Sequence, residues 1–319
     1  MKSEMIKIWK KVNGKEIIRQ YKQAKVFGFA ITEVLRLGFS KKALEIVRLS
    51  VQFKIMNKLR KKYKFVLKKN VNECTDDSFA KVQSNYVWVC WLQGMEQAPD
   101  IVKLCYKSLL EHMPERNIVV ITDNNFVNYV DIPTNIMEKW RNGIITNTHF
   151  SDILRLELLI RYGGLWVDAT VLCTGRNIPD YIFNSELFFY QTLKPGSDVQ
   201  SITMSSWLIS ACTNNRILLA ARALLYEYWS NNNKMIDYYL LHDFIHLAAE
   251  QYPNEWKRVP KVCNTTPHIL LLELFDQYDK ERMNDIKAMT CFHKLSYKFA
   301  EENLNKEGTY YKKLVNGEL

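Results

Sequence analysis

Residues 151–170 of this chain, SDILRLELLIRYGGLWVDAT, decide its fold class. Apolar residues recur at helical spacing in the first half, and Ser151 stands in front of them as a candidate helix cap. The glycine pair 163–164 predicts the end of that helix, because glycine readily adopts the backbone conformation found there. Residues 165–172, LWVDATVL, then predict a strand that carries Asp168. The segment therefore predicts a helix followed by a strand with a carboxylate in it.

Further strands and helices are predicted on both sides of this segment. Residues 86–94, YVWVCWLQG, and 117–125, NIVVITDNN, predict two buried strands, with a helix between them over residues 98–114. This order predicts a parallel pair joined by a right-handed crossover. Later in the chain, strands are predicted near residues 186–193 and 203–215, and helices over residues 217–232 and 237–252.

Composition indicates a folded protein of the cell interior. Hydrophobic residues make up 47% and charged residues 24% of the 319 residues, which provides a sizeable core and excludes wholesale disorder. No apolar run reaches the roughly 18–20 residues that span a bilayer. The seven cysteines are odd in number and form no CxxC pair, and the first residues lack the apolar core of a signal peptide. We therefore expect a reducing, cytoplasmic compartment without a disulfide framework.

Charge is distributed unevenly along the chain. Residues 1–70 contain 20 Lys and Arg against four Glu, although the whole chain carries a net charge of only +10. Residues 71–83 are polar and lose the helical period of the preceding segment. We therefore expect a basic helical extension at residues 1–75 and a main α/β domain at residues 76–319. A charge asymmetry of this size suggests that the extension meets a polyanion.

Two interpretations of the basic extension stay open. It can lie on an anionic membrane surface, held by its basic residues and by Trp9, Phe27, Phe29 and Phe53. It can equally be an ordinary helical extension with a solvated basic face. Nucleic acid is not expected as a partner, because no recognition motif supports it.

Asp168 and two residues of the preceding helix are candidate site residues. A charged residue in an apolar strand is costly unless it meets a cation or hydrogen-bond donors, and ligands of open α/β sheets bind at the carboxyl ends of strands. Asp152 and Arg155 are three residues apart near the helix start and lie on one face, where they can hold sugar hydroxyls or phosphate. Asp152 and Arg155 are also explained as a capping or surface ion pair that supports the helix.

The combination of SDxxR, YGG and a strand with Asp168 resembles the sugar-binding region of the DXD-containing glycosyltransferases. More narrowly, it is similar to the capsular polysaccharide synthesis glycosyltransferases related to family 32. The resemblance extends over roughly residues 84–299, from the first strand to CFHKLSYK at residues 291–298. It implies an α/β fold of the GT-A type, Rossmann-like, with retention of anomeric configuration. It also implies that the nucleotide-sugar donor binds near Trp91, Asp152, Arg155 and Asp168.

The family's Asp-x-Asp motif reads Asp168-Ala169-Thr170 here, in a form that the capsular branch resembles. Transfer from a nucleoside diphosphate leaves a highly charged diphosphate, which a divalent metal neutralises, and hard oxygen ligands suit Mn²⁺ or Mg²⁺. Thr170 is a weaker ligand than a carboxylate. We expect Asp168, Thr170 and His293 to hold the metal, because a C-terminal histidine completes the coordination in some GT-A enzymes.

Further site residues are expected from strand ends and from helices. The donor side is predicted to include Leu92, Asp123, Gly163, Gly164, Ser206 and Lys294, together with the residues named above. Asp237 and His242, expected in one helical segment, are candidates for the acceptor side. His242 and His246 also have the i,i+4 spacing of zinc ligands, but HDFIH lacks the glutamate of HExxH and no third ligand is evident.

Together these observations predict a retaining glycosyltransferase that transfers a hexose from a UDP-sugar, UDP-galactose or UDP-glucose, to a lipid-linked saccharide. The expected place is the inner face of a bacterial cell membrane, where the protein is peripheral and contributes to capsular or surface polysaccharide synthesis. Two alternatives remain open. One is a GT-A enzyme that modifies a protein, and the other is a non-catalytic assembly scaffold with a degenerate donor site.

Overall fold

A six-stranded mixed sheet forms the centre of the computed structural model, which describes residues 14–73, 81–193 and 203–318. Its strand order is β2-β1-β3-β6-β5-β7. The strands are β1 (Tyr86–Cys90), β2 (Asn117–Ile121), β3 (Gly164–Val167), β5 (Leu187–Gln191), β6 (Met204–Ala211) and β7 (Val262–Cys263). β1 runs parallel to both β2 and β3, whereas β6 is antiparallel to β3. The predicted parallel pair is confirmed.

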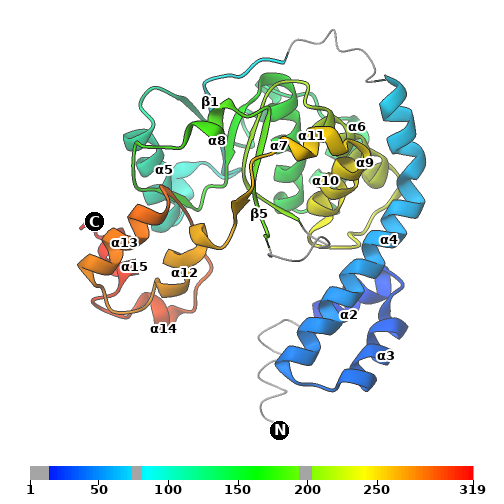
Figure 1. Ribbon diagram of the computed structural model, residues 1–319, viewed down its shortest axis with the longest axis horizontal. Helices are drawn as coiled ribbons and strands as arrows, with labels where there is room; N and C mark the ends of the chain where they lie inside the picture. Colours follow the sequence, from blue (N-terminus) through cyan, green and yellow to red (C-terminus); the bar gives the residue numbers. More distant parts are fainter. Residues whose placement is uncertain (1–13, 74–80, 194–202, 319) are drawn as a thin grey trace.

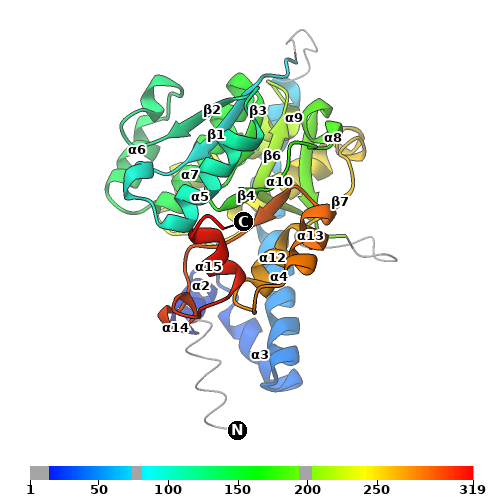
Figure 2. The same ribbon diagram turned by 90° about the vertical axis from the view of Figure 1, so that its left-hand side faces the viewer.

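Helices cover both faces of this sheet, so the domain has three layers (Figures 1 and 2). One face carries α7 (Asn147–Tyr162), α9 (Arg216–Asn231) and α10 (Leu240–Gln251), and the other carries α5 (Asp100–His112), α12 (Ile269–Glu273), α13 (Lys280–Met289) and α15 (Tyr310–Val315). Shorter helices, α6 (Thr134–Arg141), α8 (Asp180–Asn184), α11 (Pro253–Lys257) and α14 (Glu301–Leu304), join these elements. The predicted α/β class is therefore confirmed, and the arrangement is consistent with the GT-A type.

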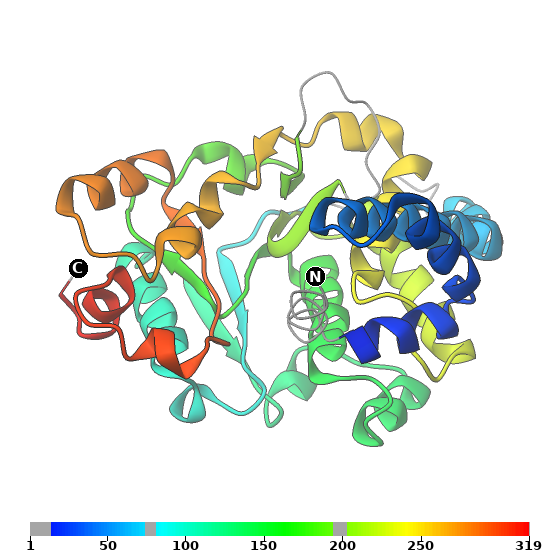
Figure 3. The same ribbon diagram turned by 90° about the horizontal axis from the view of Figure 1, so that it is seen from below.

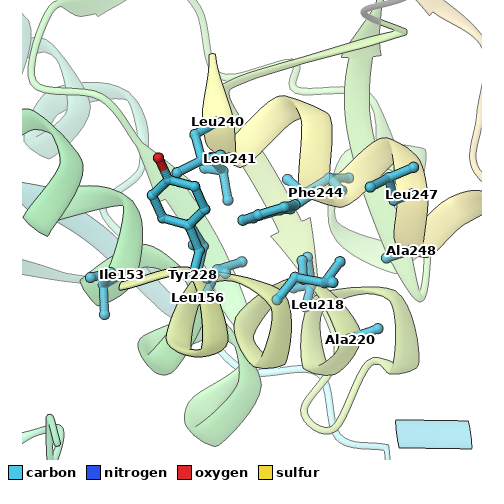
Figure 4. Close-up of a cluster of buried hydrophobic side chains, with 14 of the residues drawn as sticks. Ile153, Leu156, Leu218, Ala220, Tyr228, Leu240, Leu241, Phe244, Leu247 and Ala248 are labelled. Carbon is cyan, nitrogen blue, oxygen red and sulfur yellow. The ribbon is translucent and has the colours of Figure 1, made fainter. Parts of the chain in front are cut away.

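The core on the α7 face is built from apolar rows of three helices. Figure 4 shows Leu156 of α7, Leu218 and Tyr228 of α9, and Phe244 of α10 directed toward one another. All four side chains are almost completely buried. Each fully buried leucine or phenylalanine contributes roughly 1.5–3 kcal/mol to folding. This packing fixes α7 against the sheet and therefore positions the polar residues on its first turns.

Two details of the central segment differ from the prediction. Thr146, not Ser151, caps α7, because the helix begins five residues earlier than expected and the Thr146 side chain accepts from the His149 amide. The expected single strand is broken, since β3 ends at Val167 and β4 (Val171–Cys173) joins a separate two-stranded sheet with β8 (Phe292–Lys294). The break arises because residues 168–171 form a turn, in which the Val171 amide donates to the Asp168 carbonyl at 3.0 Å.

The N-terminal helices are α2 (Gly14–Gln23), α3 (Phe27–Leu37) and α4 (Lys41–Glu73). α4 packs on α9 and α10, and its first half projects beyond the sheet domain together with α2 and α3 (Figures 1 and 3). The predicted boundary between residues 75 and 76 lies outside the described residues, as does Trp9. The division into a basic helical extension and a main domain therefore stays a prediction.

No helix within the described ranges is long and apolar enough to cross a membrane. The six cysteines in those ranges are free thiols. One helix boundary needs correction: α10 begins at Leu240, so Asp237 lies in the connection before it and not in the same helix as His242. The backbone amide of Tyr239 donates to the Asp237 carboxylate at 2.8 Å, which keeps this connection in a turn.

Candidate functional site

α7 carries three polar residues on one buried face. His149, Asp152 and Arg155 follow at three-residue spacing and are each less than 10% exposed. Arg155 Nη1 donates to Asp152 Oδ1, and His149 Nδ1 lies 3.3 Å from Asp152 Oδ2. Burial alone would raise the pKa of Asp152, but Arg155 and then His149 lower it, and the pKa lies below its ordinary value. Asp152 is therefore an ionised carboxylate with both oxygens in use.

Asp168 lies at the carboxyl end of β3, directly across from this helix. Its backbone amide donates to the Trp207 carbonyl at 2.7 Å, which joins the end of β3 to β6. Its Oδ1 accepts from Arg155 Nη2 at 3.1 Å and from Trp166 Nε1 at 3.0 Å. Trp166 also lies under the Arg155 guanidinium, 4.6 Å from the ring centroid. Arg155 thus connects Asp152 and Asp168, as the sequence had suggested.

The second oxygen of Asp168 faces a lysine. Lys294 Nζ lies 3.9 Å from Asp168 Oδ2, donates to Thr170 Oγ1 at 2.6 Å and donates to the Leu295 carbonyl at 3.0 Å. The β4–β8 pairing places Lys294 opposite Val171, which carries the ammonium to the turn after β3. The Asp168 side chain is 29% exposed and that of Lys294 is 19% exposed. A partly accessible cation therefore stands beside the strand-end carboxylate.

His293 faces the other way. Neighbouring residues of a strand point to opposite faces, and His293 Nε2 lies 2.9 Å from Thr174 Oγ1 in the interior, with the side chain fully buried. Burial lowers the pKa of His293 to about 4. The structure brings Asp168 and Thr170 together but not His293, so the three expected metal ligands do not meet. Among the described residues no group of three or more His, Cys, Asp and Glu could hold a metal ion.

His242 of α10 lies on the α7 side of the site. Burial lowers the pKa of His242 to about 4, and the charges of Asp152, Arg155 and Asp168 act on it. Its Nδ1 is buried and has no hydrogen-bond partner among the described residues. A neutral imidazole with an unused nitrogen can bind a hydroxyl group. Asp237 lies in the connection before α10, where burial raises the pKa of its carboxyl group and the Tyr239 amide donates to it at 2.8 Å.

The ends of β1 and β2 supply aromatic and polar groups. Trp91 follows β1, and its ring centroid lies 5.2 Å from that of Tyr297. Its Nε1 is buried, and no described residue accepts a hydrogen bond from it. The Asp123 amide donates to the Leu92 carbonyl at 2.9 Å, so the two chain segments after these strands adjoin. Leu92 is buried, whereas Asp123 is exposed. These three residues share the carboxyl edge of the parallel strands with Asp168.

Gly163 and Gly164 do not belong to this site. Gly163 precedes β3 and Gly164 is its first residue, so both lie at the amino end of the strand, whereas Asp168 follows its carboxyl end. Both have positive φ, and a Cβ on Gly164 would meet the Tyr86 carbonyl oxygen at 2.4 Å. Their role is the tight connection from α7 to β3. Ala169 is buried in the turn after β3, and Ser206 is half-buried on β6 beside Trp207.

Four site residues were missed by the sequence reasoning. His149 and Trp166 carry detectable signals, because one precedes Asp152 by three helical positions and the other precedes Asp168 by two strand positions. Tyr238 contacts His149, with ring centroids 5.9 Å apart, and is 54% exposed. Tyr238 and Tyr297 carry no such signal, because only the folded chain brings them to the strand ends.

A pocket of about 440 Å³ lies elsewhere, between β7 and α13, and contains none of the predicted site residues. Its lining includes Tyr190, Cys263, Lys287 and Cys291. The candidate site is therefore defined by its chemistry and by its place at the strand ends, not by the size of this pocket.

The model of one protein family matches residues 33–314, and its description is "Capsular polysaccharide synthesis protein". This chain belongs to that family. The match includes α4 and every element that builds the site. No curated protein matches the chain. A solved structure titled "PaToxG Glycosyltransferase" is similar with a TM-score of 0.34 and 12% identity, over 82% of this chain and 97% of that one. A TM-score this low supports no argument about function.

Proposed function

We propose that this family member is a retaining glycosyltransferase that moves a hexose from a UDP-sugar to a lipid-linked saccharide during capsular or surface polysaccharide synthesis. The observation that carries the proposal is the group formed by Arg155, Asp168 and Lys294 at the carboxyl end of β3. Ligands of α/β sheets bind at this edge, and a diphosphate requires a cation there. Membership of a capsular polysaccharide synthesis family supports the saccharide product.

Lys294 is the residue proposed to contact the donor diphosphate. Its neighbours are the Thr170 hydroxyl, the Leu295 carbonyl and, at 3.9 Å, the Asp168 carboxylate, so its charge is only partly compensated. Arg155 is different, because its guanidinium is buried and already paired with two carboxylates. In this proposal Arg155 is a positioning residue that holds Asp152 and Asp168, whereas Lys294 stabilises the charge on the leaving diphosphate.

The described residues do not fit a metal ion held by the protein alone. Mn²⁺ and Mg²⁺ take about six oxygen ligands, whereas the turn after β3 offers one carboxylate, with one oxygen committed to Arg155 and Trp166. The Thr170 hydroxyl accepts from Lys294. We therefore assign stabilisation of the diphosphate charge to Lys294 and not to a metal ion held by the protein. Calorimetry with Mn²⁺ and the nucleotide-free protein should show no binding, and a tight site lost on Asp168→Asn would contradict this assignment.

Retention can proceed on one face of the sugar. Both oxygens of Asp152 are occupied. Asp168 is held by Arg155 and Trp166 through Oδ1 and faces Lys294 through Oδ2, so the proposal gives it the task of orienting this lysine and not that of a nucleophile. We therefore propose that the leaving diphosphate oxygen accepts the proton of the acceptor hydroxyl. The acceptor oxygen then bonds to the anomeric carbon while the bond from that carbon to the diphosphate oxygen breaks, on the same face.

The remaining groups fit the other parts of the two substrates. Trp91 and the exposed Tyr297 offer aromatic surface to the base or the sugar. His242 offers a neutral nitrogen to a hydroxyl group, and Tyr238 stands at the open side of His149. We place the acceptor on this side, between α10 and the strand ends, because the partly exposed polar groups of α10 and its preceding connection converge there.

The test uses the purified full chain, a panel of UDP-hexoses and a lipid-diphosphate-linked saccharide, with and without Mn²⁺. The expected result is UDP release and a glycosylated lipid, with UDP-galactose or UDP-glucose preferred, and loss of both in Lys294→Met. If no nucleotide sugar turns over and no UDP binds, the proposal fails and a non-catalytic scaffold is favoured. Transfer to a protein acceptor alone would assign the chain to the protein-modifying enzymes.

A further inference from the structure

The N-terminal helices carry an exposed apolar surface at the end that projects beyond the sheet domain. We define the hairpin tip patch as Leu35, Leu37, Phe39, Ile46, Leu49 and Phe53, which lie on the end of α3, the connection and the first turns of α4. Each of these side chains is 42–75% exposed. Leu35 and Leu37 end α3, and Ile46, Leu49 and Phe53 lie on α4, which packs against α3. Exposed apolar side chains that gather in one part of a fold mark an interaction site.

The α4 part of the patch continues a row that is buried further along the same helix. Residues 46, 49, 53, 56, 60, 63 and 67 follow alternating three- and four-residue spacing, which keeps them on one face. Met56, Tyr63 and Leu67 are buried, and Tyr63 packs edge-on against Phe244 of α10. Arg60 in the same row pairs with Glu250 of α10 at 2.7 Å. The face is thus covered where α4 runs along the domain and bare where it projects.

Basic residues accompany the bare half. Arg36, Lys41, Lys42, Arg48 and Lys54 lie among the patch residues, and Glu45 is the only acidic residue between positions 35 and 54. Glu45 is moreover paired with Arg48 at 2.6 Å. A second copy of the chain would place like charges against each other here, whereas an anionic lipid surface would meet both the charge and the apolar side chains.

We infer that the hairpin tip patch inserts into the interface of an anionic lipid bilayer and holds the protein there. The residues differ from those expected from the sequence, except for Phe53. Phe29 lies 3.9 Å under Lys54 and packs against the core, and Phe27 lies beneath Lys22, so neither is free to insert. The roughly 18 Å of α4 between Lys41 and Phe53 can lie in the headgroup region, where amphipathic helices bury their apolar face.

The patch is connected to the candidate site. Lys58 donates to the carbonyls of Ala24 and Lys25 at 2.8 and 2.7 Å, which fixes the turn between α2 and α3 on α4. α4 in turn packs against α10, which carries His242. The hairpin and the ends of β5 and β7 lie on the same lower side of the molecule in Figure 1. Docking through the patch would therefore turn the acceptor side toward the lipid surface.

The experiment is flotation of the full chain with vesicles of phosphatidylcholine alone or mixed with phosphatidylglycerol. We expect binding to the anionic vesicles only, decreasing with added salt. Lys41→Glu with Lys42→Glu should weaken binding roughly fivefold or more per lysine, since each cation near an anionic surface contributes about that factor. Leu35→Ser with Phe39→Ser and Phe53→Ser should weaken it by roughly tenfold or more, because apolar burial drives insertion.

The matched control is Leu110→Ser with Val127→Ser, which removes two comparably exposed apolar side chains, 47% and 57%, from other parts of the surface. It should float like the wild type. Equal binding to neutral vesicles, no binding at all, or equal loss in the control would overturn the inference. A dimer in light scattering that the apolar variant dissociates, without vesicle binding, would assign the patch to self-association instead. No sugar transfer is measured, so this outcome is independent of the proposed activity.

Discussion

The most informative single change is Asp168→Asn, because it removes one charge and almost no volume. In the wild type, Asp168 Oδ1 accepts from Arg155 and Trp166, and Oδ2 faces Lys294. The amide that replaces the carboxylate can preserve the two hydrogen bonds through its oxygen. Its NH₂ group would then point toward the Lys294 ammonium, and two hydrogen-bond donors cannot bond to each other. The negative charge between the two cations would be lost.

The cost to stability follows from the burial of Arg155. Its guanidinium would keep Asp152 as its only carboxylate, and its hydrogen bond to position 168 would lose the charged acceptor, which costs about 1 kcal/mol, the difference between a charged and a neutral hydrogen bond. Since domains are stabilised by about 5–15 kcal/mol, the variant should fold but unfold at lower urea concentration. Asp131→Asn is the matched control, because Asp131 pairs with Arg161 at 3.3 Å while 94% exposed. It should cost at most about 0.5 kcal/mol.

Activity should respond more strongly than stability. If Asp168 orients Lys294 and the donor, UDP release should fall by roughly 10²–10³ in kcat, the scale of losing one preorganised electrostatic group. The measurement is turnover with the donor that the panel selects, beside urea denaturation of the same samples. Turnover within about threefold of wild type would remove Asp168 from the site, because a group of this kind contributes far more than that. Unchanged stability would mean that the Arg155–Asp168 pair does not support the fold.

Three further changes test the surroundings. His293→Gln should reduce the loss of stability between pH 6.5 and 4. In the unfolded chain the histidine has a pKa near 6.5 and binds a proton in this range, whereas in the folded protein its pKa is about 4 and it stays neutral. The full effect is up to about 3 kcal/mol, measured by thermal unfolding at both pH values. Asp243→Leu should raise the free energy of unfolding at pH 7, measured by urea denaturation, by about 1–3 kcal/mol. Burial raises the pKa of Asp243, and neither of its oxygens has a hydrogen-bond partner in the described ranges. A destabilised variant would contradict this reasoning. Gly164→Ala should lower the thermal midpoint and reduce soluble yield, because its Cβ would lie 2.4 Å from the Tyr86 carbonyl at a φ of +93°; a wild-type midpoint would contradict the tight turn.

The parts of the fold that local pattern determines were predictable. β1, β2 and α5 follow from apolar runs and their flanking turn residues, and the α/β order then follows from chain connectivity. The break after Val167 was not predictable in this way. LWVDATVL has the composition of one strand, and only the pairing of Val171 with Lys294, distant in sequence, shows that β4 belongs to another sheet.

The same distinction holds for the site. Asp152, Arg155 and Asp168 were predictable, because helical spacing and a strand end place them without knowledge of long-range pairing. The sequence pointed to both His293 and Lys294, but strand alternation allows only one of them to face Asp168. Which one does so depends on the register of β8 on β4, which opposes Leu172 to His293. Register is set by long-range pairing, and the sequence carried no sign of it.

The departure from Asp-x-Asp now has a physical explanation that depends on Lys294. A carboxylate at position 170 would accept from the Lys294 ammonium, which donates to Thr170 Oγ1 at 2.6 Å, and would neutralise it. Threonine provides a hydrogen-bond acceptor of similar size without a charge, so the ammonium stays available to an anion. Asp168 lies 3.9 Å away and can orient this cation without forming a close pair. Thr170 and Lys294 are therefore best understood as one unit, which keeps a partly accessible positive charge at the strand end. In the proposed function this charge is the one that meets the donor diphosphate.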